Sequence, residues 1–527
     1  MNSKFTEALY VLIILIFVTI SCWYFGFVAI NPIDNFTNYN SGYLLLKGNI
    51  PFKDYWVTTG PLLDFLQFLI FKINGLNWGS YVLHALILNS LFTILLYFIF
   101  RKFNLEQKYS FIYSLSTGLI FYSQIGNPFV DHHSSLFSIL SILFLILGIN
   151  SKNSLFWFLV PIFLVLGFLS KQTPTSYLAI IIIFFTFYNF IFFKNYKNIS
   201  FAIFSSILII CFLLTLFYHL DITVESFLNQ YIFFASSVGE IRLDVEGFLK
   251  PFSFSRYFLK FKLIHISYIL LLIYLIKNIT SDKLFFKSKE FIIISLLICT
   301  AYALIFHQLL TLNTKFVYFY IPILCGFTHV ILKNSNFSKK FIFANFLVLT
   351  VSFFYYFSSY ILTQKFQYFC NNNLKNNVTT VKTKIIDNKF NFLWKSCLEK
   401  NPYKEIDNLK KTFEFLKKNS KDNYLLITDY QFLNVKLGKK NIKQINKWYH
   451  PGVSYPLKSS KYHGYYLKFL KDKIKSNKIK KIIFVYPSYF GSENEIYFKD
   501  IFSNCISKEQ KHLDGLINTF NIEKCFE

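Results

Sequence analysis

Apolar runs long enough to cross a membrane recur along the first 365 or so residues, separated by polar stretches. A helix needs about 20 apolar residues to span the hydrocarbon core of a bilayer. The pattern predicts about eleven such helices, several of them shorter than this. The expected segments are Leu9–Ala29, Tyr81–Phe100, Ser110–Ile125, Ser134–Ile149, Leu155–Leu169, Tyr177–Phe193, Phe201–Tyr218, Leu263–Ile276, Phe291–Leu310, Phe316–Leu332 and Phe341–Leu362. The chain is therefore expected to be a polytopic α-helical membrane protein.

The pattern changes beyond about residue 365. Apolar residues in Lys404–Lys418 have helical spacing, and Tyr424–Thr428 is strand-like; the same alternation returns between residues 465 and 486. Alternating helices and strands are typical of a small α/β domain with parallel pairing. We therefore expect a transmembrane domain, residues 1–365, followed by a C-terminal α/β domain, residues 366–527.

Composition agrees with a membrane protein, because 54% of the 527 residues are hydrophobic and only 16% are charged, against about 25% in soluble proteins. The net charge of +27 is divided between short loops and a Lys-rich tail. It favours attraction to anionic lipid or glycan, although codon drift towards Lys gives the same composition. The chain has neither a nucleic-acid motif nor a Gly-rich phosphate loop, so we expect no nucleic-acid partner and no nucleotide cofactor.

Positive charge predicts the orientation. Every expected inner loop carries Lys or Arg when the N-terminus is placed in the cytoplasm, and an odd number of spans then puts the tail outside. Four of the eight cysteines lie in that tail and could form two disulfides there. Neighbours in sequence suggest the pairs Cys370–Cys397 and Cys505–Cys525.

The stretch Asn31–Pro61 is too polar and too rich in Gly and Pro to lie in lipid as a helix. We expect a loop at the outer membrane surface, with Asp34 close to the interface and Asp54 and Tyr55 further along. A carboxylate at this position can meet a lipid headgroup and a water-borne acceptor together. The alternative is an ordinary surface loop, because Asp and Asn favour turns. Residues 62–75 are apolar on one side and are expected to lie along the membrane surface.

Two further outer turns carry residues suited to chemistry. Asp131, His132 and His133 follow one another, and carboxylate and imidazole are both metal ligands. A divalent metal ion is therefore a candidate cofactor; the alternative is a polar helix cap. Lys171 ends the fifth expected span, where it either reaches the surface or binds a phosphate or carboxylate inside the bundle.

Arginine is rare in this Lys-rich chain, and two of the three arginines, Arg242 and Arg256, lie in the outer segment from residue 219 to 262. Arginine binds phosphate in a bidentate geometry that lysine does not offer. Chance retention of the two arginines explains them equally well. His307 ends the ninth expected span on the same side, where it contacts substrate or is paired within the protein.

The ordered set of these motifs resembles bacterial GT-C membrane glycosyltransferases of the protein O-mannosyltransferase and aminoarabinose transferase type (glycosyltransferase family 39). The resemblance covers the first five or six spans. It rests on Asp34 after the first span, on Asp131 in the second outer turn, and on Lys171-Gln172-Thr173. The first loop adds a run of Gly48, Pro51, Phe52, Asp54, Gly60 and Pro61.

The resemblance implies an inverting transfer of sugar from a polyprenyl-phosphate donor to a lipid, glycan or protein acceptor on the outer face of the bacterial cytoplasmic membrane. Asp34 would be the catalytic base and Asp131 the second acidic residue. Lys171 with Arg242 or Arg256 would bind the donor phosphate. Asp54, Tyr55 and His307 would contact substrate. Many family members have Asp-Glu where this chain has Asp34-Asn35, and that departure leaves acceptor type and metal use open.

Three other interpretations of the sequence stay open. One is a non-catalytic assembly protein with a degenerate site, for which Asn35 is the only hint. A lipid-linked glycan flippase or other transporter would be expected to have charged residues in mid-span and internal repeats. An O-antigen polymerase or ligase would be expected to place its large outer loop between spans rather than at the C-terminus. The clustering of ionisable residues at one face favours the glycosyltransferase.

Overall fold

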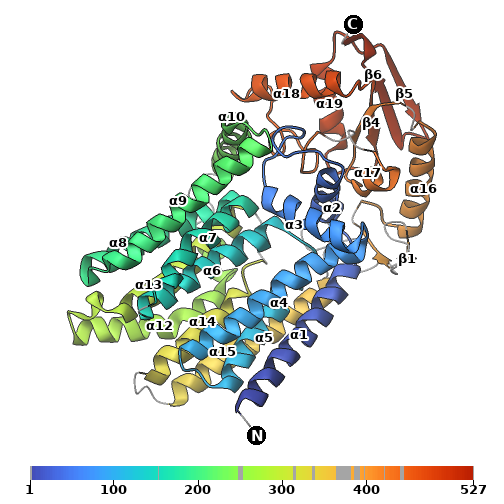
Figure 1. Ribbon diagram of the computed structural model, residues 1–527. Coiled ribbons are helices and arrows are strands. Elements are labelled where there is room, and N and C mark those ends of the chain that lie inside the picture. The colour runs from blue at the N-terminus through green and yellow to red at the C-terminus, as the bar shows by residue number, and fades with distance from the viewer. Residues whose placement is uncertain are drawn as a thin grey trace. The chain divides into compact units, whose positions relative to one another are not determined.

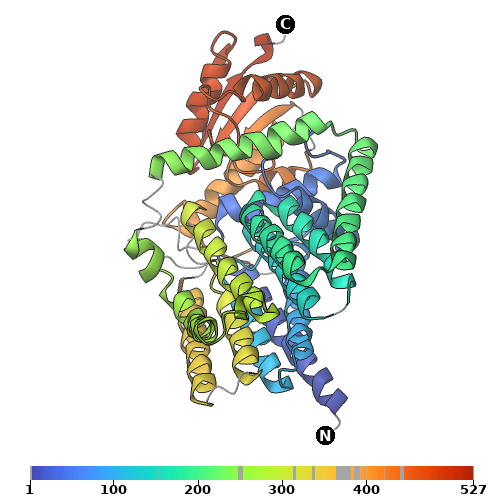
Figure 2. The same cartoon turned by 90° about the vertical axis from the view of Figure 1, so that its left-hand side faces the viewer.

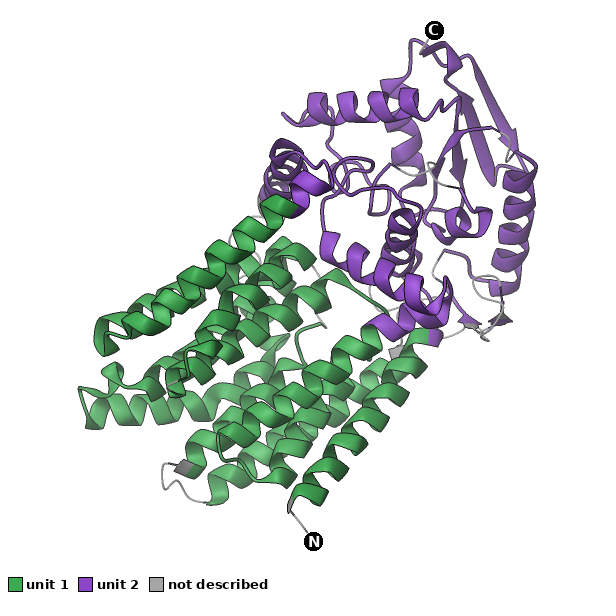
Figure 3. Cartoon of the chain, in the orientation of Figure 1, with its two compact units in different colours: residues 1–26, 85–215, 242–364 green, residues 27–84, 216–241, 365–527 purple. Residues whose placement is uncertain are grey.

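The computed structural model describes residues 3–151, 153–246, 253–311, 316–334, 339–363, 381–384, 392–396, 398–419, 422–439 and 444–525. The chain forms two compact units (Figure 3). Unit 1 comprises residues 1–26, 85–215 and 242–364, and unit 2 comprises residues 27–84, 216–241 and 365–527. One border between the units thus lies close to the expected domain boundary at residue 365, but unit 2 also takes in two earlier segments.

Unit 1 is a bundle of helices that run side by side (Figures 1 and 2). Each of the eleven expected segments falls on a helix. These helices are α1 Ser3–Phe27, α4 Trp78–Lys102, α5 Gln107–Phe121, α6 Val130–Asn150, α7 Leu155–Ser170, α8 Gln172–Phe193, α9 Tyr196–His219, α12 Lys262–Ser281, α13 Lys289–Thr311, α14 Tyr320–Asn334 and α15 Lys339–Thr363. Short π and 3-10 turns, η3 Ser255–Leu259 and η4 Phe285–Lys287, lie beside α12.

Eight of these helices are long and apolar enough to cross a membrane: α1, α4, α6, α8, α9, α12, α13 and α15. Helices α7 and α14 are apolar but shorter, and α5 has 15 residues. At 1.5 Å per residue, 15 residues extend only about 22 Å, less than the roughly 30 Å of a bilayer core. The described chain therefore contains the expected apolar helices, while the number of spans stays a prediction.

Helix α6 is the centre of unit 1. The apolar window of this helix is completely buried, and the helix packs against α7, α8 and α13. From Ile142 to Ile149 it carries only apolar side chains and Gly148, and a helix that is apolar on all sides is stable only when other helices surround it. Apart from Asn150 at its end, the polar residues of α6 lie between Asp131 and Ser141, and the candidate site lies at the start of this stretch.

Unit 2 contains a four-stranded mixed sheet in the order β3-β4-β6-β5. Strands β3 and β4 are parallel, as the alternation of helix and strand predicted, while β6 pairs antiparallel with β4 and β5. The elements of unit 2 are α2 Pro32–Leu46, α3 Pro61–Asn74, α10 Val224–Phe227, η1 Leu228–Phe233, α11 Phe234–Glu246 (which runs on into unit 1), β1 Val381–Thr383, β2 Phe392–Trp394, α16 Pro402–Lys418, β3 Tyr424–Ile427, α17 Phe432–Leu437, α18 His463–Ser476, β4 Lys481–Val485, α19 Gly491–Ile501, β5 Lys508–His512, β6 Ile517–Asn521 and η7 Glu523–Cys525.

The sheet separates two apolar cores, because successive side chains of a strand point to opposite faces. Leu426 and Ile483 face one core together with residues of α16 and α17. Leu425 and Ile482 face the other core together with residues of α18 and α19. Both cores also contain aromatic residues from the segment 27–84, so this early segment and the C-terminal domain fold as one body.

The expectation of a loop throughout Asn31–Pro61 is wrong, because residues 32–46 form helix α2. Helix α2 is too polar to lie in lipid, but most of its side chains are buried inside unit 2. The Phe36 ring packs 4.8 Å from the ring of Phe432, and Asn434 Nδ2 donates to Asn40 Oδ1 at 3.2 Å. Buried amides are stable when they are hydrogen-bonded, and unit 2 supplies the partners that lipid lacks.

One of the two suggested disulfides, Cys505–Cys525, is formed in unit 2 and fastens the end of α19 to η7. Cys370 and Cys397 lie outside the described residues.

Gly126 provides a test of the packing of unit 1. Its φ of +65° is a conformation that favours glycine, and an added Cβ would overlap the backbone of Phe25 and Gly26. We expect Gly126→Ala to lower the free energy of unfolding by about 3 kcal/mol or more. Gly239→Ala is the control, because Gly239 lies in helix α11 with open space around it. Thermal unfolding in detergent measures both, and equal melting temperatures for the two variants would contradict this packing.

Candidate functional site

The N-terminus of α6 and the turn between α7 and α8 are joined by a network of hydroxyl groups. Ser134 Oγ donates to the carbonyl oxygen of Lys171 at 3.1 Å, and the hydroxyls of Ser134 and Ser138 each lie 2.8 Å from the Thr175 hydroxyl. Gly167 allows this approach, because a Cβ there would lie 2.7 Å from Ser138 Oγ. The network fixes Lys171 in extended backbone between the two helices.

Lys171 and His307, which were predicted separately from the sequence, both contact the carboxylate of Asp131, a third predicted residue. Asp131 Oδ1, in the first turn of α6, lies 2.7 Å from Lys171 Nζ and 2.6 Å from His307 Nε2. The Asp131 side chain is 3% exposed and the His307 side chain is fully buried. The second ring nitrogen of His307, Nδ1, has no hydrogen-bond partner among the described residues. It can accept a hydrogen bond when the ring is neutral, or donate one when the ring is protonated.

Arg242, in α11, belongs to the same electrostatic neighbourhood. Burial lowers the pKa of the Arg242 guanidinium, and the Asp131 carboxylate opposes that shift. Arginine stays charged in proteins nevertheless. The Asp131 carboxylate thus contacts one cation, Lys171, and interacts at longer range with the charge of a second, Arg242, so positive charge exceeds negative charge here even with a neutral His307. The N-termini of α6 and α8 add partial positive charge, so an anion is the ligand that this arrangement favours.

Arg256 lies in η3, where its charge acts on Lys260. Arg242 is an arginine whose charge interacts with that of Asp131, and the part that either arginine plays in binding phosphate stays a prediction.

The side chains of His132 and His133 turn away from Asp131. The His132 ring packs among Phe121, Tyr122, Phe129 and Phe316, and His133 Nδ1 lies 2.8 Å from the Tyr122 hydroxyl. Among the residues that the structure describes, no three His, Cys, Asp or Glu side chains converge as metal ligands. Asp131, His132 and His133 thus have different surroundings here, and a metal ion held by them stays a prediction.

Asp34 lies in the first turn of helix α2 in unit 2. Asn31 Nδ2 donates to Asp34 Oδ2 at 2.7 Å, and the Asn31 backbone N–H donates to Asn35 Oδ1 at the same distance. The two side chains thus tie the start of the helix to the residue that precedes it. Asn35 thus has a structural partner, the backbone of Asn31.

Sequence reasoning missed two residues that share the surroundings of Asp34. Asp429 and Tyr489 follow the carboxyl ends of β3 and β4, and the Tyr489 N–H donates to Asp429 Oδ2 at 2.7 Å. Burial, followed by the charges of Asp429, Asp34 and Glu405, raises the pKa of the Tyr489 phenol. The signal available in the sequence was their position after two parallel strands, where ligand-binding residues of α/β sheets gather.

Asp54 and Tyr55 have structural partners in unit 2. The Asp54 carboxylate accepts the Ile50 N–H at 2.9 Å and lies 3.1 Å from Lys473 Nζ. The Tyr55 hydroxyl donates at 3.2 Å to Asp64, a fully buried carboxylate that the sequence analysis did not single out. Ser41 also donates to Asp64. These contacts show how the turn before α3 is held, and the proposed contact of Asp54 and Tyr55 with substrate stays a prediction.

No protein-family model and no curated protein matches this chain.

Asp131 should contribute more to stability than a surface acid in an equally short ion pair. We expect Asp131→Asn to lower the free energy of unfolding by about 3 kcal/mol, because it leaves buried groups without their charged partner. Asp407→Asn is the control: Asp407 also lies 2.7 Å from a lysine, Lys411, but both side chains are more than half exposed, so we expect less than about 1 kcal/mol. Chemical unfolding in detergent compares them, and equal losses would contradict a buried, structural pair at Asp131.

Asp429 should make stability depend on pH. Burial raises the pKa of Asp429 from 3.8 to about 6, against the opposing hydrogen bonds from Tyr489 and Ser488. The folded state then binds the proton more tightly than the unfolded state, so stability falls as the pH rises from about 4 to about 6. Lowering the pH from 7.5 to 5 should stabilise the wild type by about 1.4 kcal/mol relative to Asp429→Asn. Melting temperatures at both pH values measure this, and parallel pH profiles would refute it.

Proposed function

We propose that the protein is a membrane glycosyltransferase that moves a sugar from a polyprenyl-phosphate donor to an acceptor hydroxyl. The observation that carries the proposal is the cationic group around Asp131 at the ends of apolar helices. A donor of this kind has an apolar chain and a phosphate, and the group offers Lys171 and Arg242 to that phosphate. No soluble nucleotide is needed, because the lipid phosphate itself is the leaving group.

Within this proposal Asp131 holds the other residues rather than contacting the sugar. It is 3% exposed and receives both Lys171 Nζ and His307 Nε2. A carboxylate in this position prevents the lysine from turning into solvent and fixes the ring of His307. The Lys171 side chain is 15% exposed, so it is not completely enclosed, and we propose that its ammonium group also binds the phosphate. His307 Nδ1 provides a further contact when the ring is protonated.

The reaction breaks the bond between the anomeric carbon and the phosphate oxygen and forms a bond from that carbon to the acceptor oxygen. The acceptor hydroxyl loses its proton as it attacks, and Asp34 is the proposed base for that proton. The phosphate gains negative charge as it leaves, and Lys171 and Arg242 are the proposed residues that stabilise it. A single displacement inverts the anomeric configuration.

A lipid-linked glycan flippase and an O-antigen polymerase or ligase remain the alternatives. A transporter would place its ionisable residues in mid-span. Here Asp131 lies in the first turn of α6, Lys171 lies between two helices, and His307 lies in the last turns of α13. This distribution favours chemistry at the end of the bundle over passage through it.

We further propose that the protein lies in the bacterial cytoplasmic membrane, with its N-terminus inside and its C-terminal domain in the periplasm. The charge pattern of the loops supports this orientation. The Cys505–Cys525 bond agrees with it, because disulfides persist in oxidising compartments.

Transfer of radiolabelled sugar from a polyprenyl-phosphate donor in membrane vesicles tests the proposal. Asp34→Asn should lower the rate at least 100-fold, because general-base catalysis contributes about 10²–10⁴. Asp221→Asn is the control, since Asp221 belongs to the same unit and is 81% exposed in an ion pair with Lys53. Both variants must insert at wild-type levels. Unchanged transfer with Asp34→Asn would reject the base, and no transfer by the wild type from any such donor would reject the enzyme.

A further inference from the structure

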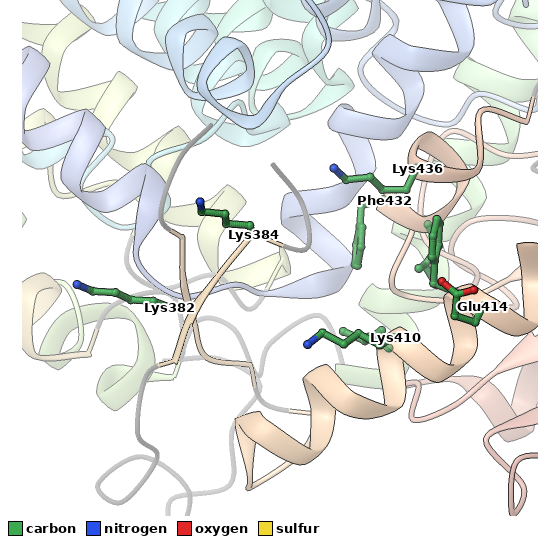
Figure 4. A pocket seen from close by; sticks show the side chains of 9 residues that line it. Lys382, Lys384, Lys410, Glu414, Phe432 and Lys436 are labelled. Carbon is green, nitrogen blue, oxygen red and sulfur yellow. The ribbon is translucent and has the colours of Figure 1, made fainter. Parts of the chain in front are cut away.

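A pocket of about 480 Å³ opens in unit 2 between β1, α16 and α17 (Figure 4). Four lysines line it: Lys382 and Lys384 from the β1 side, Lys410 from α16 and Lys436 from α17. Glu414 is the one acidic residue of the lining. In Figure 4 the ammonium groups of Lys410 and Lys436 extend from their helices towards the β1 side. The rim of the pocket is therefore strongly positive.

Within the described residues, Lys382, Lys384 and Lys410 form no ion pair with a carboxylate, whereas Lys411, the next residue on α16, pairs with Asp407 at 2.7 Å. Lysines that bring unneutralised charge together repel one another. An anionic ligand relieves that repulsion. The positive charge of the rim thus favours an anionic ligand.

The other lining residues are apolar: Leu409, Phe413, Phe432 and Leu433. They continue the core between the sheet and α16 and α17. A small inorganic anion has no surface to place against such a floor. A ligand that combines an anionic group with hydrocarbon fits both parts of the lining, and the volume is that of an ordinary small-molecule site.

The β1 side of the pocket lies close to where the chain leaves its first apolar helix. Strand β1 pairs with β2, and β2 is bonded in turn to the residues that follow α1. The Ala29 N–H donates to the Leu393 carbonyl at 3.0 Å and the Ile30 N–H to the Lys395 carbonyl at 2.8 Å. Helix α1 ends at Phe27 and is a candidate membrane span. Ala29 and Ile30 follow the end of this helix by two and three residues, and this closeness along the chain is the reason to consider a lipid headgroup as the ligand.

We propose that this pocket binds the anionic headgroup of a membrane phospholipid. The lysines bind the phosphate, and the apolar floor covers the glycerol and the first part of an acyl chain. The proposal does not depend on the proposed glycosyl transfer. The occupied pocket would border α2, because Phe432 of its floor packs 4.8 Å from Phe36, two residues beyond Asp34.

The test measures binding of fluorescent phosphatidylglycerol to the purified full-length protein in a neutral detergent. Phosphatidylcholine with the same label reports apolar binding alone, and unlabelled glycerol phosphate is added as a soluble competitor. Lys384→Gln with Lys410→Gln removes one charge from each wall of the pocket. Lys411→Gln with Lys417→Gln is the matched control, since it removes two exposed charges from α16 outside the lining.

We expect phosphatidylglycerol to bind in preference to phosphatidylcholine and the pocket pair to weaken that binding roughly tenfold or more, because each lysine near an anionic lipid contributes about 1 kcal/mol. The control pair should change the affinity by less than about twofold. Glu414→Gln should tighten binding, and it keeps the test decisive if the pocket pair fails to fold.

Four results would overturn the proposal. Equal losses in the pocket pair and the control pair would mean diffuse attraction to a basic surface. Displacement of the lipid by glycerol phosphate at equal concentration would identify a soluble anion as the ligand. An affinity for phosphatidylcholine equal to that for phosphatidylglycerol, or an affinity unchanged by Glu414→Gln, would remove the role of charge.

Discussion

A carboxylate buried among apolar helices must be neutralised, and Asp131 is the point at which unit 1 meets this requirement. An unpaired charge at such a position would cost several kcal/mol. The lysine between α7 and α8 and the histidine near the end of α13 supply the compensation at 2.7 Å and 2.6 Å. Three helices are thereby tied to α6, and the hydroxyl network of Ser134, Ser138 and Thr175 orients the turn that carries Lys171. The same contacts leave the Lys171 side chain partly exposed and, among the described residues, His307 Nδ1 without a hydrogen-bond partner; these are the groups on which the proposed binding of a phosphate rests.

Unit 2 also buries polar side chains, and most of those on helix α2 are neutral. Helix α2 is rich in Asn, Ser and Thr, and nearly all of it is buried. Amides and hydroxyls pack inside a protein when each finds a partner. Asn434 and Asp64 provide such partners from α17 and α3. The C-terminal domain is therefore part of the structure that holds Asp34, and it brings Asp429 and Tyr489 into the electrostatic surroundings of that residue.

The residues around Asp131 and the buried acids of unit 2 differ in how far the sequence could predict them. Asp131, Lys171 and His307 were found because each stands out as an ionisable residue at the end of an apolar run. Their meeting on a single oxygen atom could not be foreseen, since 40 residues separate Lys171 from Asp131 and 176 separate His307 from it. Asp64 and Asp429 were missed because each is a single aspartate among polar and apolar neighbours. An aspartate in such a sequence is usually interpreted as part of a turn. His132 and His133 looked like metal ligands by adjacency alone, yet successive residues of a helix point about 100° apart.

Local period and close spacing in the sequence were enough to predict the apolar helices and a parallel pairing of strands and to suggest the Cys505–Cys525 bond. They could not show that the polar stretch after the first helix is a buried helix, or that residues 27–84 belong with the C-terminal domain. These outcomes depend on which surfaces meet across hundreds of residues. A pattern read along the chain shows what a residue can do, whereas its partners in space determine what it does.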